Sequence, residues 1–448
     1  MTHSATLPYP SQHPAQYPAE PLAVRPSLTY AGGLPRLLPS YGAVPVDLET
    51  HLRSHGRLPY RGRPELITGD VEAAGLTGRG GAAFPTYRKL AAVAGYGRTP
   101  VVVGNGAEGE PASNKDKSLL WISPHLVLDG LQLAAEAVGS RTVGLYVHRN
   151  PRLHQHLAAA IAQRAHAGID AARVELIEAP PRFLAGEESA LASVTSGGPA
   201  LPRFKPPRAS QRGVADRPTL VQNVETLAHL ALIGRYGAAW FRSVGTADEP
   251  GSMLTTLHYA DGSRNVVEVP LGIPITDLLR LDGQVQAVLA GGYHGTWLPA
   301  AQAAQLPLAN AALRPLGAAV GAGVLAALPA GRCGVAETAR VVRYLALESA
   351  GQCGPCFNGL PRMATALGSL AGPRPDPQAR ADLERWSGLV VGRGACHHPE
   401  GTVRLIRSAL QVFAGEIDRH ARGQCTGSSR QPFLPLPAEP ALDEADWR

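Results

Sequence analysis

Residues 99–198 alternate short apolar segments with longer amphipathic ones, and this alternation limits the possible folds more than any other feature of the chain. Residues 100–104 and 141–147 read as strands, and residues 124–138 between them carry apolar side chains at helical spacing. A second helix follows, and a third strand covers residues 173–177. Strands joined by helices of this length pair in parallel with right-handed crossovers. The sequence therefore predicts an α/β domain built on a parallel sheet.

The spacing of apolar residues changes twice after this domain. A hairpin is predicted at 253–269, and helical spacing returns at 335–349 and continues to a last helix at 402–420. Both ends of the chain are rich in Pro and small residues without periodicity. We predict five segments: a disordered Pro-rich leader at 1–35, a ligand-binding α/β domain at 36–242, a β-rich module at 243–330, a helical domain at 331–422 and a disordered tail at 423–448.

Composition excludes several classes of protein. No run approaches the roughly 18 apolar residues of a membrane span, and the first residues lack the pattern of a signal peptide. The net charge of +6 is not gathered into Lys/Arg blocks, which argues against nucleic-acid binding. Five cysteines is an odd count and argues against a secreted disulfide framework. We expect a cytoplasmic protein with no direct membrane insertion.

A glycine-rich loop at 78–85, followed by Lys89, is the first candidate site. Glycine N–H groups can form a nest for an anion, and Arg79 and Lys89 can add charge-assisted bonds to a phosphate. Only four of the 42 basic residues are lysines, which suggests that these positions need a compact ammonium group. The four are Lys89, Lys115, Lys117 and Lys205.

Two more polar loops follow predicted strands, at 104–111 and 185–189. Their carboxylates suit the hydroxyl groups of a ribose or ribityl chain, although acidic residues at a helix N-terminus are also favourable without a ligand. Loops at the carboxyl ends of parallel strands meet at one edge of the sheet, where such folds bind ligands. The sequence therefore predicts a nucleotide-like or flavin ligand at this edge.

A second constellation consists of Cys353, Cys356 and Cys396, with His397 and His398 beside the last. The C-x-x-C spacing directs two sulfurs to one centre. Three interpretations stay open: an iron–sulfur site short of one thiolate, a Cys3His zinc site, or thiols without a metal. The remaining two cysteines, at positions 333 and 425, stand alone in the sequence and are interpreted as free thiols.

Together these motifs resemble the family of the complex I flavoprotein, the F or 51 kDa subunit of NADH-quinone oxidoreductase, over residues 75–413. The segments that carry the resemblance are GRGGAAFPT at 78–86, NGAEGEPASNKDK at 105–117, AGEESA at 185–190, NVETL at 223–227 and ESAGQCGPC at 348–356. The resemblance implies an FMN-binding α/β domain, a ubiquitin-like β-grasp module and a C-terminal helical iron–sulfur domain.

The resemblance also implies roles for single residues. FMN would be held by Gly78, Arg79, Gly80, Gly81, Lys89, Asn105, Glu108, Gly186, Glu187, Asn223 and Thr226. A reduced nicotinamide nucleotide would face Phe84, Glu110, Glu188 and Lys205, and Cys353, Cys356 and Cys396 would ligate a 4Fe–4S cluster. No catalytic acid or base is needed, because the flavin carries the chemistry.

Four positions depart from the family pattern. Ala350 stands where the family has its first cluster cysteine, so we expect a labile 4Fe–4S cluster, with a group such as His397, His398 or water on one iron, or a 3Fe–4S centre. Ala107 replaces an aspartate, while Ala92 and Arg208 replace aromatic residues beside the nucleotide, so binding of NADH should be weak. The alternative at Arg208 is a contact with the 2′-phosphate of NADPH, which would favour that nucleotide. We predict an NAD(P)H dehydrogenase-type subunit that passes electrons singly to a ferredoxin-like or other redox partner. The alternative is a non-catalytic scaffold with a Cys3His zinc site.

Overall fold

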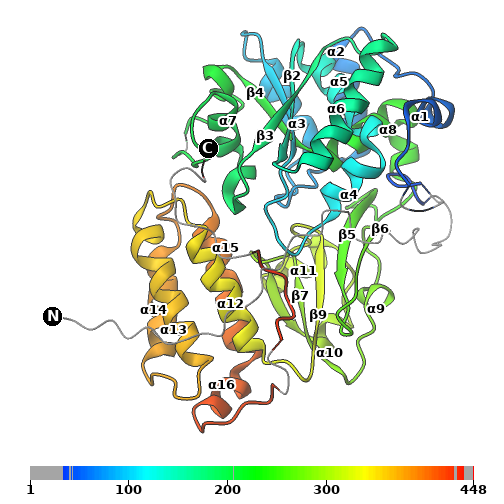
Figure 1. Cartoon of the computed structure of the whole chain (residues 1–448). Helices are drawn as coiled ribbons and strands as arrows, with labels where there is room; N and C mark the ends of the chain where they lie inside the picture. The colour runs from blue at the N-terminus through cyan, green and yellow to red at the C-terminus, as the bar shows by residue number, and fades with distance from the viewer. Residues whose placement is uncertain are drawn as a thin grey trace.

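The computed structural model describes residues 34–39, 42, 44–204, 206–427, 431–437 and 447. Its upper lobe in Figure 1 is an α/β domain on a four-stranded parallel sheet of order β3-β2-β1-β4. The predicted parallel sheet is therefore confirmed, and β4 adds an edge strand that the sequence did not reveal. The strands are β1 (Val101–Gly106), β2 (Thr142–His148), β3 (Val174–Ala179) and β4 (Thr219–Asn223).

Helices pack against both faces of this sheet. The closest packing joins α5 to α8, where a Cβ on Gly130 would lie 2.0 Å from the backbone oxygen of Leu227, so only glycine fits. The helices of the lobe are α1 (Leu48–His55), α2 (Pro64–Ala74), α3 (Thr86–Ala94), α4 (Lys115–Ile122), α5 (Pro124–Val138), α6 (Pro151–His166), α7 (Glu188–Thr195) and α8 (Val224–Phe241).

A five-stranded mixed sheet of order β6-β5-β9-β7-β8 lies below the α/β lobe. The predicted hairpin is confirmed by the antiparallel pairing of β5 with β6, and β5 also pairs in parallel with β9. Three short helices, α9 (Ile275–Leu278), α10 (Ala300–Ala303) and α11 (Asn310–Leu313), connect its strands. The strands are β5 (Ser252–His258), β6 (Arg264–Pro270), β7 (Val285–Ala290), β8 (Thr296–Pro299) and β9 (Val324–Pro329).

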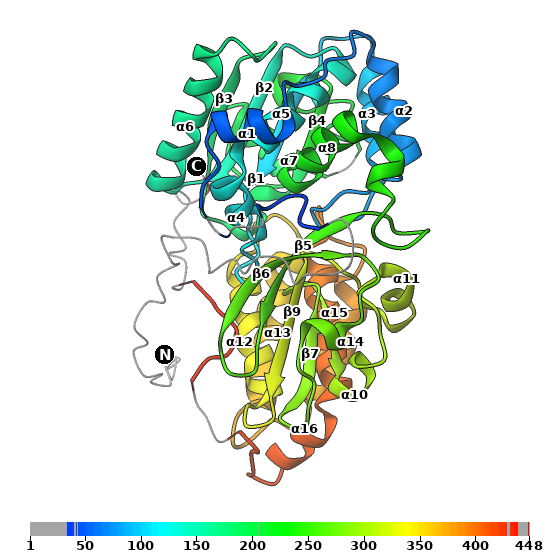
Figure 2. The same ribbon diagram turned by 90° about the vertical axis from the view of Figure 1, so that its right-hand side faces the viewer.

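The third part is a helical bundle that lies behind this sheet in Figure 2. The sequence predicts one helix at 402–420, but the structure has two, which meet at Phe413. The backbone of Phe413 has φ −104° and ψ 23°, outside the helical region, and its buried ring packs edge-on against Trp297 at 5.3 Å between ring centroids. The helices are α12 (Gly334–Leu347), α13 (Leu360–Leu370), α14 (Ala379–Val390), α15 (His398–Val412) and α16 (Ala414–His420).

Part of the predicted tail is packed rather than loose. Phe433 and Leu434 are 6% and 1% exposed, and their N–H groups donate to the carboxylate of Glu337 on α12 at 3.1 and 3.2 Å. Two apolar side chains and a paired carboxylate explain the order of this segment. The predicted leader lies outside the described residues, apart from Leu34 and Pro35. Among the residues described, no helix is both long and apolar enough to cross a bilayer.

Candidate functional site

The loops after β1 and β3 meet at the carboxyl edge of the parallel sheet, as the sequence predicts, and the junction of β4 with α8 lies beside them. Asn105 at the end of β1 donates through Nδ2 to the carbonyl oxygen of Gly186 at 2.8 Å. Asn223 at the end of β4 donates through Nδ2 to Asp116 at 2.7 Å. A Cβ on Gly186 would lie 2.7 Å from the backbone oxygen of Ala107, so the loops approach too closely for any other residue.

The glycine-rich loop lies against the same edge. Its ends are joined by a hydrogen bond from the N–H of Gly78 to the carbonyl oxygen of Phe84 at 2.9 Å. Gly81 has φ +108°, which only glycine adopts readily. A Cβ on Gly80 would lie 3.2 Å from Cβ of Asn223, and the hydroxyl of Thr226 accepts the N–H of residue 79 at 2.8 Å. The loop is thus fixed to the start of α8.

Arg79 does not point toward the space above the loop, which differs from the predicted phosphate contact. Its guanidinium is buried and donates to the carbonyl oxygens of Thr77, Pro250 and Ser252 at 3.1 to 3.3 Å. A buried charge needs such partners, and these carbonyls satisfy it. The side chain therefore ties the loop to β5, which follows it by about 170 residues in sequence.

Lys89 is a cation at this edge of the sheet. Its ammonium lies 3.2 Å from the carbonyl oxygen of Val221 and 3.5 Å from a carboxylate oxygen of Glu188, and one third of its side chain is exposed. An ammonium has three donors, so these contacts leave it able to turn toward an anion. Phe84, 39% exposed, lies in the loop that precedes the helix of Lys89.

The two carboxylates of the β1 loop make contacts within the protein. Glu108 is buried, which raises its pKa, and it accepts from the hydroxyl of Ser113 and the N–H of Asp116. Burial raises the pKa of Glu110 to about 7. Glu110 accepts the N–H of Tyr293 at 2.7 Å, and so joins the α/β lobe to the turn between β7 and β8. Through these contacts Glu108 fixes the start of α4, and Glu110 fixes the α/β lobe against the turn between β7 and β8.

Sequence reasoning singled out Lys115 without finding its partners. The buried ammonium lies 2.7 Å from Asp116 and 2.8 Å from Glu225, whose other oxygen accepts the N–H of Leu254 at 2.8 Å. One of these partners, Glu225, is the glutamate of the NVETL segment at 223–227, which the family resemblance already singles out. This network braces the start of α8 against β5. Lys205, the remaining predicted nucleotide contact, lies outside the described residues.

One short segment, η1 (Phe183–Gly186), joins this edge to the cysteine constellation. Its last residue, Gly186, and the following Glu187 belong to the sheet edge, where Glu187 caps α7 through hydrogen bonds from the N–H groups of residues 189 and 190. Leu184 and Ala185 pack in one apolar cluster with Cys396. This segment therefore borders both candidate centres.

The three predicted metal-binding cysteines converge. The sulfurs of Cys353 and Cys356 are 3.3 Å apart, and Cys356 and Cys396 are buried. Burial raises the pKa of Cys396 to about 11, and the neighbouring thiols add to this rise. The Glu187 carboxylate acts in the same direction, so it lies within electrostatic reach of the sulfur. Three thiolates can serve three corners of a cubane cluster.

One of the two predicted histidines is engaged elsewhere in the protein. His398 is buried with Nε2 2.7 Å from the carbonyl oxygen of Leu345 and Nδ1 3.0 Å from His294, so both ring nitrogens are engaged. His397 is exposed at the N-cap of α15. Ala350 packs against the cluster that contains Cys396, with a methyl group where a thiolate would be needed. The three thiols therefore fit three iron positions, and His397, beside Cys396, stays a candidate for the fourth.

Comparison with known proteins gives the family. The Nuo51 FMN-binding domain matches residues 71–232, and the NADH-ubiquinone oxidoreductase-F iron-sulfur binding region matches residues 336–420. The second F subunit of NADH-quinone oxidoreductase in Rhizobium meliloti is 29% identical over 376 residues, which are 80% of this chain and 89% of that protein. The chain belongs to the family of the NADH-quinone oxidoreductase F subunit.

Other members of this family are similarly distant. The F subunit of NADH-quinone oxidoreductase in Streptomyces coelicolor is 28% identical over 381 residues, covering 81% of this chain and 84% of that protein. Among solved structures, the NAD+-reducing NiFe hydrogenase in the air-oxidized state has a TM-score of 0.75 and 30% identity, covering 89% of this chain and 67% of that one. Its H2-reduced form has a TM-score of 0.74 and 27% identity, covering 84% of this chain and 67% of that one.

Proposed function

We propose that this chain is an FMN- and iron–sulfur-dependent electron-transfer subunit that oxidises a reduced nicotinamide nucleotide. The observation that carries the proposal is the position of η1, because Gly186 bonds to Asn105 at the flavin edge while Leu184 and Ala185 belong to one apolar cluster with Cys396. When bound, FMN supplies the conversion between two-electron oxidation of the nucleotide and one-electron transfer. The protein's part is to hold the flavin and the cysteines on opposite sides of one short segment.

The residues at the edge suit a flavin mononucleotide. The glycine loop offers backbone N–H groups, and Lys89 supplies the positive charge for a phosphate. Asn105 and Asn223 offer amide groups at the ends of adjacent strands. Arg79 orients the loop rather than touching the ligand. We assign the remaining contacts to Gly78, Gly80, Gly81, Glu108, Gly186, Glu187 and Thr226.

We assign nucleotide binding to the outer side of the same edge. Phe84 offers an exposed ring, and Glu188 lies beside Lys89. Glu110 is held in position beside this site by the hydrogen bond that it accepts from the N–H of Tyr293. Lys205 belongs to the same assignment on the family resemblance. With alanine at position 92 and an exposed arginine at 208, the nucleotide loses stacking partners, and we expect it to bind weakly.

We assign the domains from the family resemblance. Residues 36–242 would hold FMN, residues 243–330 would form a ubiquitin-like β-grasp module, and residues 331–422 would form the iron–sulfur domain. The cysteines would hold either a 3Fe–4S centre or a 4Fe–4S cluster with one iron lacking a thiolate. Because His398 is engaged through both nitrogens, a Cys3His zinc site would have to use His397. Phe357, next to Cys356 and 69% exposed, offers an apolar contact for a ferredoxin-like or other cytoplasmic redox partner.

Anaerobic purification followed by absorption spectroscopy tests this function. A flavin band that is bleached by NADH or NADPH, together with a broad iron–sulfur absorption, would support it. Protein that releases no flavin on denaturation would exclude it.

A further inference from the structure

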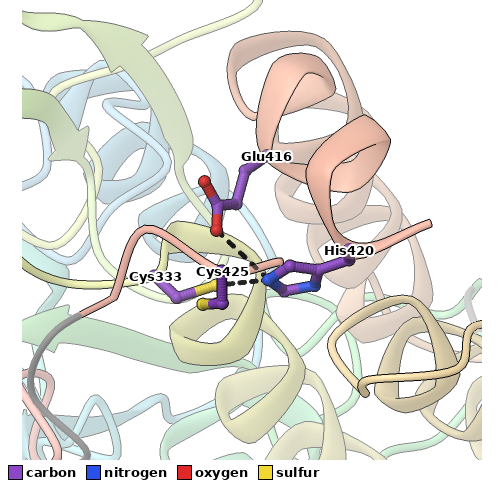
Figure 3. A group of neighbouring side chains, drawn as sticks. All are labelled: Cys333, Glu416, His420 and Cys425. Carbon is purple, nitrogen blue, oxygen red and sulfur yellow. Dashed lines mark hydrogen bonds and ion pairs between the residues drawn. The ribbon is translucent and has the colours of Figure 1, made fainter. Parts of the chain in front are cut away.

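Four potential metal ligands meet at the far end of the helical bundle, away from the flavin edge (Figures 1 and 3). They are Cys333, Glu416, His420 and Cys425, and one ligand atom from each lies within 4.8 Å of all the others. The two cysteines were interpreted from the sequence as isolated free thiols. The fold instead brings their sulfurs together, although they lie at opposite ends of the helical domain in sequence.

Each ligand is placed by a separate local feature. Cys333 is the N-cap of α12, and its sulfur accepts the N–H of Ala336 at 3.4 Å. Glu416 and His420 lie one turn apart on α16 and face the same side of the helix, as Figure 3 shows. Cys425 follows the turn that ends this helix. Three of the four residues are buried and Cys425 is exposed.

The hydrogen bonds around His420 orient it as a ligand. Its Nδ1 lies 2.8 Å from the carbonyl oxygen of Leu370, which must accept a proton from the ring. In the neutral ring Nε2 then carries the lone pair, and it lies 3.2 Å from a carboxylate oxygen of Glu416 and 3.5 Å from the sulfur of Cys333. Electron-rich atoms at these distances repel one another unless a proton or a cation lies between them.

The carboxylate of Glu416 is also held in place. One oxygen accepts from Arg419 at 2.6 and 3.0 Å and from the hydroxyl of Thr426 at 2.5 Å. The other oxygen, which faces His420, accepts the N–H of Thr426 at 2.9 Å. These bonds keep the carboxylate ionised and fix its direction, as outer partners do for ligands in metal sites.

We propose that Cys333, Glu416, His420 and Cys425 bind one structural Zn2+ ion. Two thiolates, one imidazole and one carboxylate form a donor set typical of tetrahedral zinc. Four protein ligands close the coordination sphere, which favours a structural role. The ion would connect the start of α12 to α16 and the segment after it, whose residues Phe433 and Leu434 pack along α12.

Metal analysis of two matched double variants tests this site. Wild-type protein purified without chelator should hold about one zinc per chain at a closed site of this kind. Cys333→Ser/Cys425→Ser should lose that zinc, and Cys353→Ser/Cys356→Ser should keep it. Zinc that disappears with the second pair instead of the first would overturn the proposal.

Thiol labelling of the wild-type protein provides a second test that does not depend on a variant folding. A zinc chelator should speed alkylation of Cys333 and Cys425 and lower the melting temperature, and added Zn2+ should reverse both changes. Mass spectrometry identifies the labelled positions. A disulfide between the two cysteines, or labelling that zinc does not slow, would contradict the proposal.

Discussion

Reversing the charge of Lys89 is the sharpest perturbation of the proposed flavin site. The ammonium lies at the edge where the glycine loop and Glu188 meet, 3.5 Å from that carboxylate. In Lys89→Glu, a carboxylate would face both Glu188 and the phosphate of FMN. We expect the variant to bind FMN more weakly and to retain its fold, because the position is partly exposed.

The size of the effect follows from the geometry. Two unit charges about 4 Å apart interact by about 4 kcal/mol at an effective dielectric constant near 20. Charge reversal removes one such attraction and adds one such repulsion, but solvent screens most of both because one third of the Lys89 side chain is exposed, and a net loss of about 2 kcal/mol should remain. That corresponds to roughly 30-fold weaker binding of FMN.

Arg88→Glu is the matched control. Arg88 lies on the same helix, is exposed and donates to the hydroxyl of Tyr87 at 3.0 Å. The substitution therefore makes the same change of charge as Lys89→Glu, but at a side chain that is not assigned to the phosphate. Apo-protein is titrated with FMN, and flavin fluorescence is followed at two salt concentrations. Equal FMN affinity in the two variants would refute the assignment of Lys89 to the phosphate.

Four further outcomes are expected. Gly186→Ala should abolish flavin retention, seen as the absence of a flavin band, because its Cβ would lie 2.7 Å from a backbone oxygen. In anaerobic stopped-flow, NADH should reduce the flavin slowly or only at high concentration, and fast reduction would show that the missing aromatic residues are dispensable. The pKa of Glu110 is raised to about 7, so Glu110 contributes its full share to the free energy of unfolding below about pH 4.5, and this share declines as the pH rises through 7. Chemical denaturation at several pH values measures this decline, and Glu110→Gln should remove it. Ala350→Cys should increase iron retention in air and lower the reduction potential of the cluster, measured by iron assay and EPR titration.

The arrangement of the flavin edge could be predicted from the sequence because it depends on local patterns. The period of apolar residues specifies parallel strands, and the carboxyl ends of such strands meet at one edge. The apolar period therefore predicts that the loops of Asn105 and Gly186 lie together, whereas Asn223 enters only through the family resemblance. The C-x-x-C spacing likewise placed Cys353 beside Cys356.

The direction of individual side chains could not be predicted, because it depends on packing between distant segments. Arg79 turns to carbonyl oxygens of a strand in another sheet, and Glu110 bonds to a turn that follows it by 183 residues. His398 is engaged by His294 from the β-rich module. The meeting of Cys333 with Cys425 depends on how α16 packs against the start of α12. No local period encodes these contacts.

Flavin and cluster should both bind to this chain, on opposite sides of η1, and cofactor analysis of anaerobically purified protein tests this most directly. We predict about one FMN per chain together with about three to four irons, as a three-cysteine iron–sulfur site would hold. Reduction by dithionite should change the EPR signal of the cluster. Colourless protein that carries zinc on Cys353, Cys356 and Cys396 would contradict the account.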